Sequence, residues 1–586
     1  MTASSTDTDS GLLLRVLSTL LREDVAGLRT RSTTVTAADG IWLRLATTER
    51  NAVLLPVHHT TPGFQSRTEA RLPLLRCEHD GRELTGADDI LAALAVLADP
   101  RDRTGFDAFA AEIRQAATAQ RLHAASKAAI AATLAGHYGA HPARDWRGLP
   151  ASLAYDTLAA RLDHPVYPTG RGRSGLTESE LRAYAPEFHP RFPLRWLALP
   201  QENVITQGAL PDLFPHPSAL GLPAALDHSH RCLPLHPRTV GEPLERALHT
   251  MGLTDRAVLA ARAELDAVPT LSMRTVALTG DPRTHLKLPL ATATLGRLNR
   301  RTIKPGTLTD GVAGQRLLER VIAREPRFRH SILHADESRF AHAGHELIAV
   351  LVRRLPAGLD DTAVVPLAAL LAPAPGGGLI IGALAEHFYR GDTLALLDAF
   401  LTLLFDWQTT LLGYGIALES HQQNISLLLD APHGKTRLRL LFKDNDGPRI
   451  HTARLRATLG EEGNGFDDPR IHTHSDTPIL DLFTTITVHL CAGAYAFGLA
   501  RHGYAPLERL LTLIRDRLDE AADRLGTRPG QPGALLRSHV LDAAHLPIKA
   551  MVTAGTLLAK ERSGASDINK HYGTGPNYLA PRKVRP

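Results

Sequence analysis

Two apolar runs in the last third of the chain constrain its fold most strongly, because they read as neighbouring strands with polar ends. The first run, GIALESHQQNISLLLD, is separated from the second, TRLRLLFKDNDGPRI, by a turn expected at residues 431–434. Two strand-like runs on either side of a turn predict a hairpin. Such a hairpin would bring the polar start of the first run close to the polar end of the second.

The polar side chains at that end of the hairpin suit a divalent cation. If the first run is extended, Glu419, His421 and Gln423 share one face, and Asn424 follows them. The second run ends in Lys443, Asp444, Asp446 and Gly447. Magnesium takes one or two carboxylates together with phosphate oxygens and water, so we predict Mg²⁺ at Glu419 and Asp444. The alternative is a buried polar hairpin that satisfies its own hydrogen bonds.

A second polar cluster lies earlier in the chain, in PTLSMRTV. Ser272, Arg274 and Thr275 fall within four residues of an otherwise apolar strand, and Lys287 follows in HLKLPL. The turn-like GDPRT between the two runs predicts a β-hairpin over residues 269–290. Taken singly, Arg274 or Lys287 is better explained as an edge-strand charge that blocks aggregation. Together with the acidic pair, the hydroxyls and cations indicate a nucleotide site.

The chain is also too long for one hydrophobic core. Cores stop growing at roughly 250–300 residues, and this chain has 586. We expect residues 1–140 to form a helical first lobe and residues 141–360 a second lobe with the phosphate-binding strands. Residues 361–586 should form a largely helical third lobe with the metal and carboxylate sites. Its clearest helix begins after Pro506, with leucines repeating on one face.

Charge, cysteines and the chain start limit the class of protein. The net charge of +5 is spread without a block of Lys or Arg, so no nucleic-acid partner is expected. Three cysteines without a CxxC pair argue against a disulfide scaffold and favour a reducing compartment. The start lacks a signal-peptide layout, and the most apolar stretch is interrupted by Asp398 and Asp406. We therefore expect a cytoplasmic protein that does not associate with a membrane.

The order of these blocks over roughly residues 149–579 resembles the NRPS-independent siderophore (NIS) synthetases of the IucA/IucC family. PTLSMRTV, HLKLPL, ESHQQN, KDNDG and the late PNYL are the closer matches. DHPVYPTGRGRSG is similar to the family pattern G-H-P-x-H-P-x-x-K-x-R-x-G, with Tyr167 in place of a second histidine and Arg171 in place of the lysine. LPLHPRTV, which contains His236, resembles a family block but lacks its Trp-Gln pair.

The resemblance implies both a fold and a reaction. The implied fold is α+β, a three-lobed cupped hand of thumb, fingers and palm, mostly helical with antiparallel sheets in fingers and palm. The implied enzyme is an acyl-adenylate-forming ligase that uses ATP and Mg²⁺ to activate citrate, a citrate derivative or another dicarboxylate. It would condense the acid with an amine or alcohol and release AMP and pyrophosphate. A homodimer is expected by the same resemblance.

The resemblance also implies roles for individual residues. The implied nucleotide-binding set comprises His164, Thr169, Arg171, Ser272, Arg274, Thr275, Lys287, Gln423 and Asn424. The implied metal ligands are Glu419 and Asp444. The implied catalytic set is His421, Arg301 and Arg274. His421 would orient the acid or assist the nucleophile, and Arg301, with Arg297 and Arg300 as competitors, would grip a carboxylate. Specificity would lie near residues 549–579, where three cations have no assigned role: Lys549, Lys560 and Arg562.

Two other classes of protein remain open. A small-molecule kinase would also bind Mg-ATP, and H-x-x-N-I-x-L-L-L followed by D-x-D-G echoes kinase loops. A kinase catalytic loop needs an acidic base between the His and the Asn, whereas Gln422 and Gln423 stand there. A basic helical binding protein is the non-enzymatic alternative, and it predicts no thermal shift with Mg-ATP.

Overall fold

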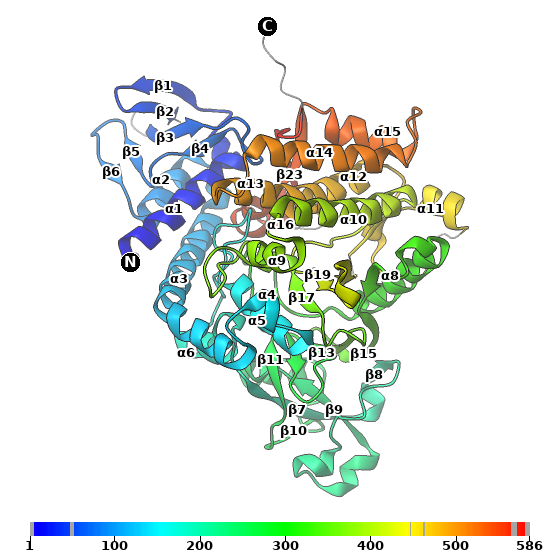
Figure 1. Ribbon diagram of the computed structural model, residues 1–586. Coiled ribbons are helices and arrows are strands. Elements are labelled where there is room, and N and C mark those ends of the chain that lie inside the picture. The colour runs from blue at the N-terminus through cyan, green and yellow to red at the C-terminus, as the bar shows by residue number, and fades with distance from the viewer. Residues whose placement is uncertain (1–4, 47–51, 446, 461–462, 564–570, 581–586) are drawn as a thin grey trace.

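The computed structural model describes residues 5–46, 52–445, 447–460, 463–563 and 571–580. Helices and five sheets make up this described part, which has an α+β architecture (Figure 1). In Figure 1 the first 140 residues lie at the left. The sheet formed by the middle of the chain lies at the bottom, and the C-terminal helices lie at the upper right.

The first 140 residues contain the predicted helices and a sheet that we did not predict. The helices are α1 (Ser5–Arg22), α2 (Ala87–Leu97) and α3 (Arg103–Tyr138). The strands are β1 (Thr33–Ala37), β2 (Gly40–Leu45), β3 (Val53–His59), β4 (Thr68–Ala70), β5 (Leu75–Cys77) and β6 (Glu83–Leu84). They form one six-stranded sheet. The expectation of a mostly helical first lobe was therefore incomplete.

The middle of the chain builds a nine-stranded sheet. Its strands are β7 (Phe192–Pro200), β8 (Ile205–Gln207), β9 (His230–Leu235), β10 (Val258–Leu259), β11 (Glu264–Pro269), β12 (Thr275–Leu278), β13 (Thr284–Lys287), β15 (Asp336–His345) and β16 (Ile348–Arg354). The order is β10-β7-β11-β12-β13-β16-β15-β8, with β9 beside β7, and the pairs are antiparallel. The hairpin predicted over residues 269–290 is confirmed as β12–β13. The helices here are α4 (Pro142–Asp145), α5 (Gly148–Ala160), α6 (Glu178–Tyr184), α7 (Glu242–Thr250) and α8 (Pro305–Arg324).

The hairpin predicted on either side of residues 431–434 is confirmed as β19 (Ile425–Asp430) and β20 (Arg437–Phe442). Ile425 pairs with Phe442, and the turn falls at the expected residues. β14 (Ile332–His334) joins β20 in parallel and β17 (Ala363–Pro366) joins β19, so this sheet is not wholly antiparallel. Smaller sheets contain β18 (Ile416–Ala417), β21 (Arg449–His451) and β22 (His472–Thr473), and β23 (His545–Lys549) with β24 (Tyr572–Pro576).

Helices dominate the rest of the third part, as predicted. They are α9 (Ile380–Tyr389), α10 (Thr393–Gly413), α11 (Thr452–Leu459), α12 (Thr477–Phe483), α13 (Ala494–Arg501), α14 (Leu507–Asp523), α15 (Pro532–Leu536) and α16 (Lys560–Ser563). Three segments are π-helical: η13 (Thr484–Gly493), η14 (Arg537–Leu541) and η15 (Thr553–Leu557). The helix expected after Pro506 is α14, which buries Leu510, Ile514 and Leu518 on one face.

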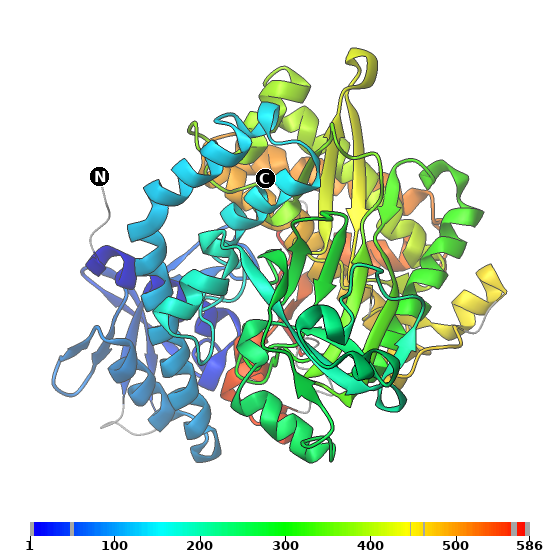
Figure 2. The ribbon, with the colours of Figure 1, turned by 90° about the horizontal axis from the view of Figure 1, so that it is seen from below.

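The clusters of buried apolar side chains do not coincide with the three predicted lobes. One cluster of buried side chains runs from α1 through α3 and α10 to α14, so the first and last parts share a core. A separate cluster lies against the nine-stranded sheet. Figure 2 shows the N-terminal and C-terminal parts meeting beside that sheet. The division at residues 140 and 360 stays a prediction.

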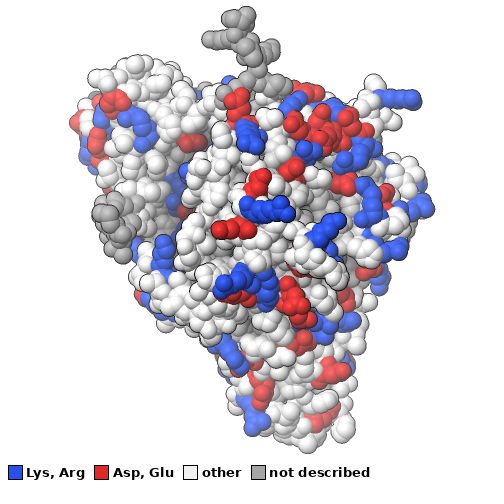
Figure 3. Space-filling view, in the orientation of Figure 1, with Lys and Arg blue, Asp and Glu red and all other residues white. Residues whose placement is uncertain are grey.

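Two helical stretches are long and apolar enough to cross a membrane, Thr393–Gly413 and Thr477–Arg501. Within the protein, 61% and 89% of their most apolar windows are buried, and both stretches contribute side chains to the shared core. Core helices have this composition too. On the face shown in Figure 3, acidic and basic side chains are interspersed.

Candidate functional site

The loop after β20 meets the end of β13 at Asp444. Lys287 Nζ lies 2.5 Å from Asp444 Oδ1, and Arg353 Nη2 lies 3.3 Å from the same oxygen. Asp444 has a left-handed backbone, with φ of 66°. The cationic stretch and the acidic stretch, which lie far apart in the sequence, therefore come together as predicted.

The charge state of Asp444 follows from its cationic neighbours. Burial by itself would raise the pKa of this carboxyl, but Lys287, Arg353 and Arg274 outweigh burial and hold the pKa well below its ordinary value. Asp444 is therefore ionised at neutral pH, as a metal-binding or phosphate-facing carboxylate must be.

A second buried carboxylate, Glu337, holds the Asp444 loop in position. It accepts the backbone N–H of Asp444 at 3.0 Å and that of Asn445 at 3.4 Å. Glu337 also pairs with Arg353. Both residues were missed by the sequence analysis, although a charge at either end of the apolar strands β15 and β16 was a usable signal. Their side chains are only 2% and 4% exposed, so this pair is part of the interior.

Glu419 and His421 lie in the loop between β18 and β19. Lys549 Nζ is 2.8 Å from Glu419 Oε1. Burial lowers the pKa of His421, and Lys549 and Arg301 lower it further, while Glu419 and Asp444 act in the opposite direction. His421 therefore lies within electrostatic reach of both predicted metal ligands and of the predicted carboxylate-binding arginine.

The backbone around His421 is a turn and not the extended run that we expected. The His421 N–H donates to the Glu419 carbonyl at 3.0 Å, and the Asn424 N–H donates to the His421 carbonyl at 2.8 Å. Asn424 Nδ2 also donates to the Glu419 carbonyl, at 3.4 Å, and the Gln423 N–H donates to His421 Nδ1 at 3.3 Å. These local hydrogen bonds replace strand pairing, because polar side chains and backbone groups can satisfy one another within the turn.

Ser272 and Arg274 also lie at a turn, between β11 and β12, where we expected a strand, whereas Thr275 is the first residue of β12 and pairs with Lys287. Ser272 Oγ donates to Thr275 Oγ1 at 3.2 Å, and Arg274 Nη1 donates to the Thr302 carbonyl at 2.7 Å. Met273, at φ of 61°, marks the tight point of the turn. The hydroxyls and the guanidinium thus cluster at the end of the hairpin that carries Lys287.

The three arginines considered for carboxylate binding, Arg297, Arg300 and Arg301, have different surroundings. Arg300 pairs with Glu346 at 2.9 Å, and its side chain is 64% exposed. Arg297 Nε donates to the Thr556 carbonyl at 3.2 Å. Arg301 is the arginine of the three whose charge lowers the pKa of His421. This arrangement supports the choice of Arg301.

The early block divides between two environments. Burial, with a smaller effect of His421, lowers the pKa of His164 to about 3, and His164 Nδ1 accepts the Tyr167 N–H at 3.1 Å. Arg171 pairs with Asp163 at 2.9 Å, and Thr169 Oγ1 donates to Glu112 at 3.2 Å. Arg171 and Thr169 are thus engaged by protein carboxylates, where we expected phosphate contacts.

The described residues contain no group of three or more His, Cys, Asp or Glu side chains that could hold a metal. Glu419 and Asp444 each contact a lysine, so a cation at either carboxylate would compete with an ammonium. Two carboxylates fit Mg²⁺, which takes its remaining ligands from phosphate and water. Asp446 lies outside the described residues.

The C-terminal cations have different surroundings. Lys549 belongs to the group around His421, whereas Arg562 pairs with Asp102 at 2.8 Å and Asp99 at 3.0 Å in the first lobe. The side chain of Lys560 lies outside the described part.

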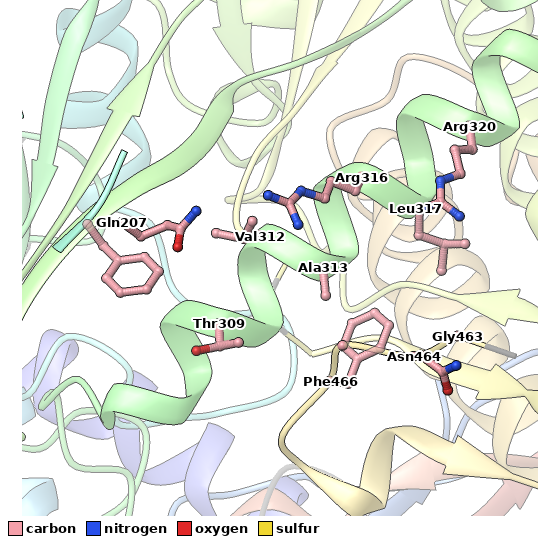
Figure 4. A pocket seen from close by; sticks show the side chains of 12 residues that line it. Gln207, Thr309, Val312, Ala313, Arg316, Leu317, Arg320, Gly463, Asn464 and Phe466 are labelled. Carbon is pink, nitrogen blue, oxygen red and sulfur yellow. The ribbon is translucent and has the colours of Figure 1, made fainter. Parts of the chain in front are cut away.

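Two pockets lie elsewhere on the molecule. One, of about 180 Å³, lies between α8 and residues 463–466, with Arg316, Gln207 and Phe466 on its walls (Figure 4). The other, of about 470 Å³, lies beside α9 and is lined in part by Tyr504. None of the predicted site residues lines either pocket.

Two family models match parts of the chain. Residues 152–372 match the IucA / IucC family, and residues 395–564 match the ferric iron reductase FhuF-like transporter family. The expected resemblance to the IucA/IucC family is confirmed over residues 152–372. The first match contains the turn of Ser272 and Arg274, and the second contains the two loops that carry His421 and Asp444.

Curated relatives of the chain are named as synthases or biosynthesis proteins of siderophores. Staphyloferrin A synthase of Staphylococcus aureus is 24% identical over 53% of this chain and 55% of its own length. The rhizobactin siderophore biosynthesis protein RhbC of Rhizobium meliloti is 28% identical over 61% and 64%. Aerobactin synthase of Escherichia coli is 26% identical over 54% and 60%. The matched region thus spans less than two thirds of the length of these relatives.

Solved structures extend the likeness to the whole fold. The petrobactin biosynthesis protein AsbB of Bacillus anthracis aligns with a TM-score of 0.71 at 16% identity, covering 97% of this chain and 95% of that one. The ATP-bound aerobactin synthetase IucA of Klebsiella pneumoniae aligns with a TM-score of 0.67 at 18% identity, covering 97% and 99%. The expected three-lobed α+β fold is confirmed.

Proposed function

We propose that this protein is an ATP-dependent siderophore synthetase. It would adenylate a carboxylate and condense it with an amine or alcohol. The observation that carries the proposal is the meeting of Lys287 and Asp444 beside His421, Glu419 and Lys549. Two lysines on strands, Lys287 and Lys549, thus lie near the neutral imidazole of His421. Two carboxylates in loops, Asp444 and Glu419, lie near it as well. The names of the curated relatives support the same chemistry.

The division of labour follows from the side chains. A free carboxylate is a poor acyl donor, because its carbon is electron-rich and its leaving group is poor. Arg274 and Lys287 would bind phosphate oxygens, since a guanidinium and an ammonium supply charge-assisted donors. Arg301 would hold the acid. Preorganised cations of this kind stabilise the charge that develops as pyrophosphate leaves.

The lowered pKa of His421 suits a proton acceptor. Its imidazole is neutral at physiological pH, so it can take a proton from an incoming amine or alcohol. Glu419 and Asp444 would hold Mg²⁺, and the bound ion would offset phosphate charge. The ATP-bound state of the Klebsiella neighbour supports ATP as the nucleotide. We also propose that the enzyme works in the cytoplasm as a homodimer, without nucleic acid or membrane.

A small-molecule kinase is the second candidate. Between His421 and Asn424 the chain offers two glutamines, and the Gln422 amide donates to the Leu490 carbonyl at 2.6 Å. An amide in that position cannot serve as the acidic base of a kinase loop. The ligase is therefore the better supported of the two.

An ATP-dependent screen of polycarboxylates against amines and alcohols, with mass detection of condensed products, tests the proposal. We expect a product from at least one acid and nucleophile pair. The Asp444→Asn variant should lose product formation, while the exposed Arg300→Gln variant should keep it. Condensation that proceeds without ATP, or equally well in Asp444→Asn, would contradict the proposed site.

A further inference from the structure

Glu112, a partly buried carboxylate on α3, joins segments from all three parts of the chain. Its oxygens accept hydrogen bonds from the Tyr167 hydroxyl at 2.8 Å, Thr169 Oγ1 at 3.2 Å and Thr556 Oγ1 at 2.6 Å. Within the described chain no cation contacts it. Burial raises the pKa of Glu112, and the three hydroxyl donors oppose that shift. This carboxylate is therefore held by three hydroxyl donors together with the backbone N–H of Arg297.

These hydrogen bonds orient Thr556. Because its single hydroxyl proton points at Glu112, its lone pairs are left to accept other donors. One of them accepts the Arg297 N–H at 3.3 Å. The Thr556 carbonyl accepts Arg297 Nε at 3.2 Å, and the Gly555 carbonyl accepts the Leu298 N–H at 3.1 Å. η15 thus binds the loop of residues 296–299 through three hydrogen bonds.

The contact between η15 and this loop is also close-packed. A Cβ added at Gly296, which has φ of 112°, would lie 2.8 Å from the Gly555 carbonyl oxygen. Arg301 lies four residues after the anchored Arg297 in the chain. Its backbone N–H donates to the Thr292 carbonyl at 2.9 Å. The Arg301 carbonyl also accepts the Leu290 N–H at 3.0 Å, so Arg301 is held on one side by residues 290–292 and on the other by the loop that η15 anchors.

We propose that Glu112 is a positioning residue for substrate carboxylate binding: it orients Thr556, and Thr556 anchors the loop that presents Arg301. Tyr167 is part of the same hydrogen-bond network, since its phenol supplies one of the donors that hold Glu112. The inference rests on the proposed function, because Arg301 is the group assigned to the carboxylate.

The test separates acid binding from nucleotide binding. In Glu112→Gln one of the two acceptor oxygens becomes an N–H donor, so the hydroxyls that donate to Glu112 can no longer all keep their acceptor and the hydrogen bonds that orient Thr556 are disrupted. We expect the KM for the carboxylic acid to rise by about tenfold or more, the scale of a lost hydrogen bond to a charged group. The KM for ATP and the Mg-ATP-induced thermal shift should change little. Thr556→Val should reproduce the effect, and Thr556→Ser, which keeps the hydroxyl, should restore the wild-type KM.

Arg300→Gln is the matched control in the same loop, because Arg300 pairs only with the partly exposed Glu346 among described contacts. An acid KM that is unchanged in both Glu112→Gln and Thr556→Val would overturn the inference. Equal loss in Thr556→Val and Thr556→Ser would overturn it as well, since packing alone would then explain the effect. Failure of the proposed function looks different: the wild-type protein would make no ATP-dependent product.

Discussion

The pair of Glu337 and Arg353 shows how single residues set the site. Each side chain is almost fully buried, and Glu337 also satisfies two backbone N–H groups of the Asp444 loop. Such a pair is not itself strong evidence for stability, because desolvation offsets the attraction between its charges. Breaking it is another matter, since the two N–H groups would lose their acceptor and the buried Arg353 would keep Asp444 but lose its shorter ion pair.

We therefore expect Glu337→Ala to lower the free energy of unfolding by about 3–5 kcal/mol. Glu346→Ala removes a partly exposed carboxylate that pairs with Arg300 and accepts the Thr302 hydroxyl, and it should cost about 1 kcal/mol. Urea unfolding of both variants, followed by circular dichroism, measures the difference. Equal, small losses would mean that Glu337 does not hold the loop.

His421 carries the second prediction for a single residue. If its neutral imidazole accepts a proton in the reaction, His421→Ala should reduce ATP- and acid-dependent pyrophosphate release by about 10²–10⁴-fold. The exposed His474→Ala serves as control, with unchanged release expected. Wild-type rates in His421→Ala would remove this residue from the site.

Among the elements, α3 makes a close backbone contact with the C-terminal part at Gly105. A Cβ at Gly105 would overlap the Leu557 carbonyl oxygen of η15, whereas a Cβ at Gly136, on the same helix, would meet no atom within 4 Å. Gly105 therefore permits the contact through which Glu112 reaches Thr556.

This contrast gives a prediction with its own control. Gly105→Ala should lower the thermal midpoint and weaken acid binding, because a backbone oxygen cannot rotate away. Gly136→Ala should raise stability by up to about 1 kcal/mol, since alanine favours the helix over glycine. Differential scanning fluorimetry of both variants provides the comparison. A stable, fully active Gly105→Ala protein would show that α3 and η15 can separate without consequence.

The elements also show what the sequence could and could not predict. Both hairpins were predictable, because apolar runs of strand length flank turn residues. The six-stranded N-terminal sheet was not, since its strands are short and β1 is largely exposed, which removes the buried alternation that identifies a strand. The His421 turn was mistaken for a strand because alternation of polar residues does not distinguish the two. Glu337 and Arg353 were missed because the pairing of β15 with β16, which brings them together, was not predicted.

At the scale of the whole molecule, acid stability should reflect the buried histidines. Burial lowers the pKa of His236 to about 3 and that of His489 to about 4. The folded protein keeps both neutral, while the unfolded chain protonates them below its ordinary pKa of about 6.5. The unfolded state then binds more protons, so stability falls as pH falls from about 6.5 towards 4.

At pH 5.5 each such histidine should cost about 1.4 kcal/mol relative to pH 8. We expect the thermal midpoint to drop steadily from pH 7 to pH 5, and the drop to be smaller in His489→Gln, which cannot titrate. Scanning calorimetry across this range measures both slopes. A midpoint that stays level or rises on acidification would contradict the burial of neutral imidazoles.

The claim that organises the whole molecule is that strands from the middle of the chain and loops from its last third form one site for adenylating a carboxylate. Chromatography of the nucleotides formed with ATP, Mg²⁺, a polycarboxylate and an amine tests it most directly. The account predicts AMP and pyrophosphate, formed in equal amounts with the condensed product. ADP as the nucleotide product, or unchanged ATP, would contradict it.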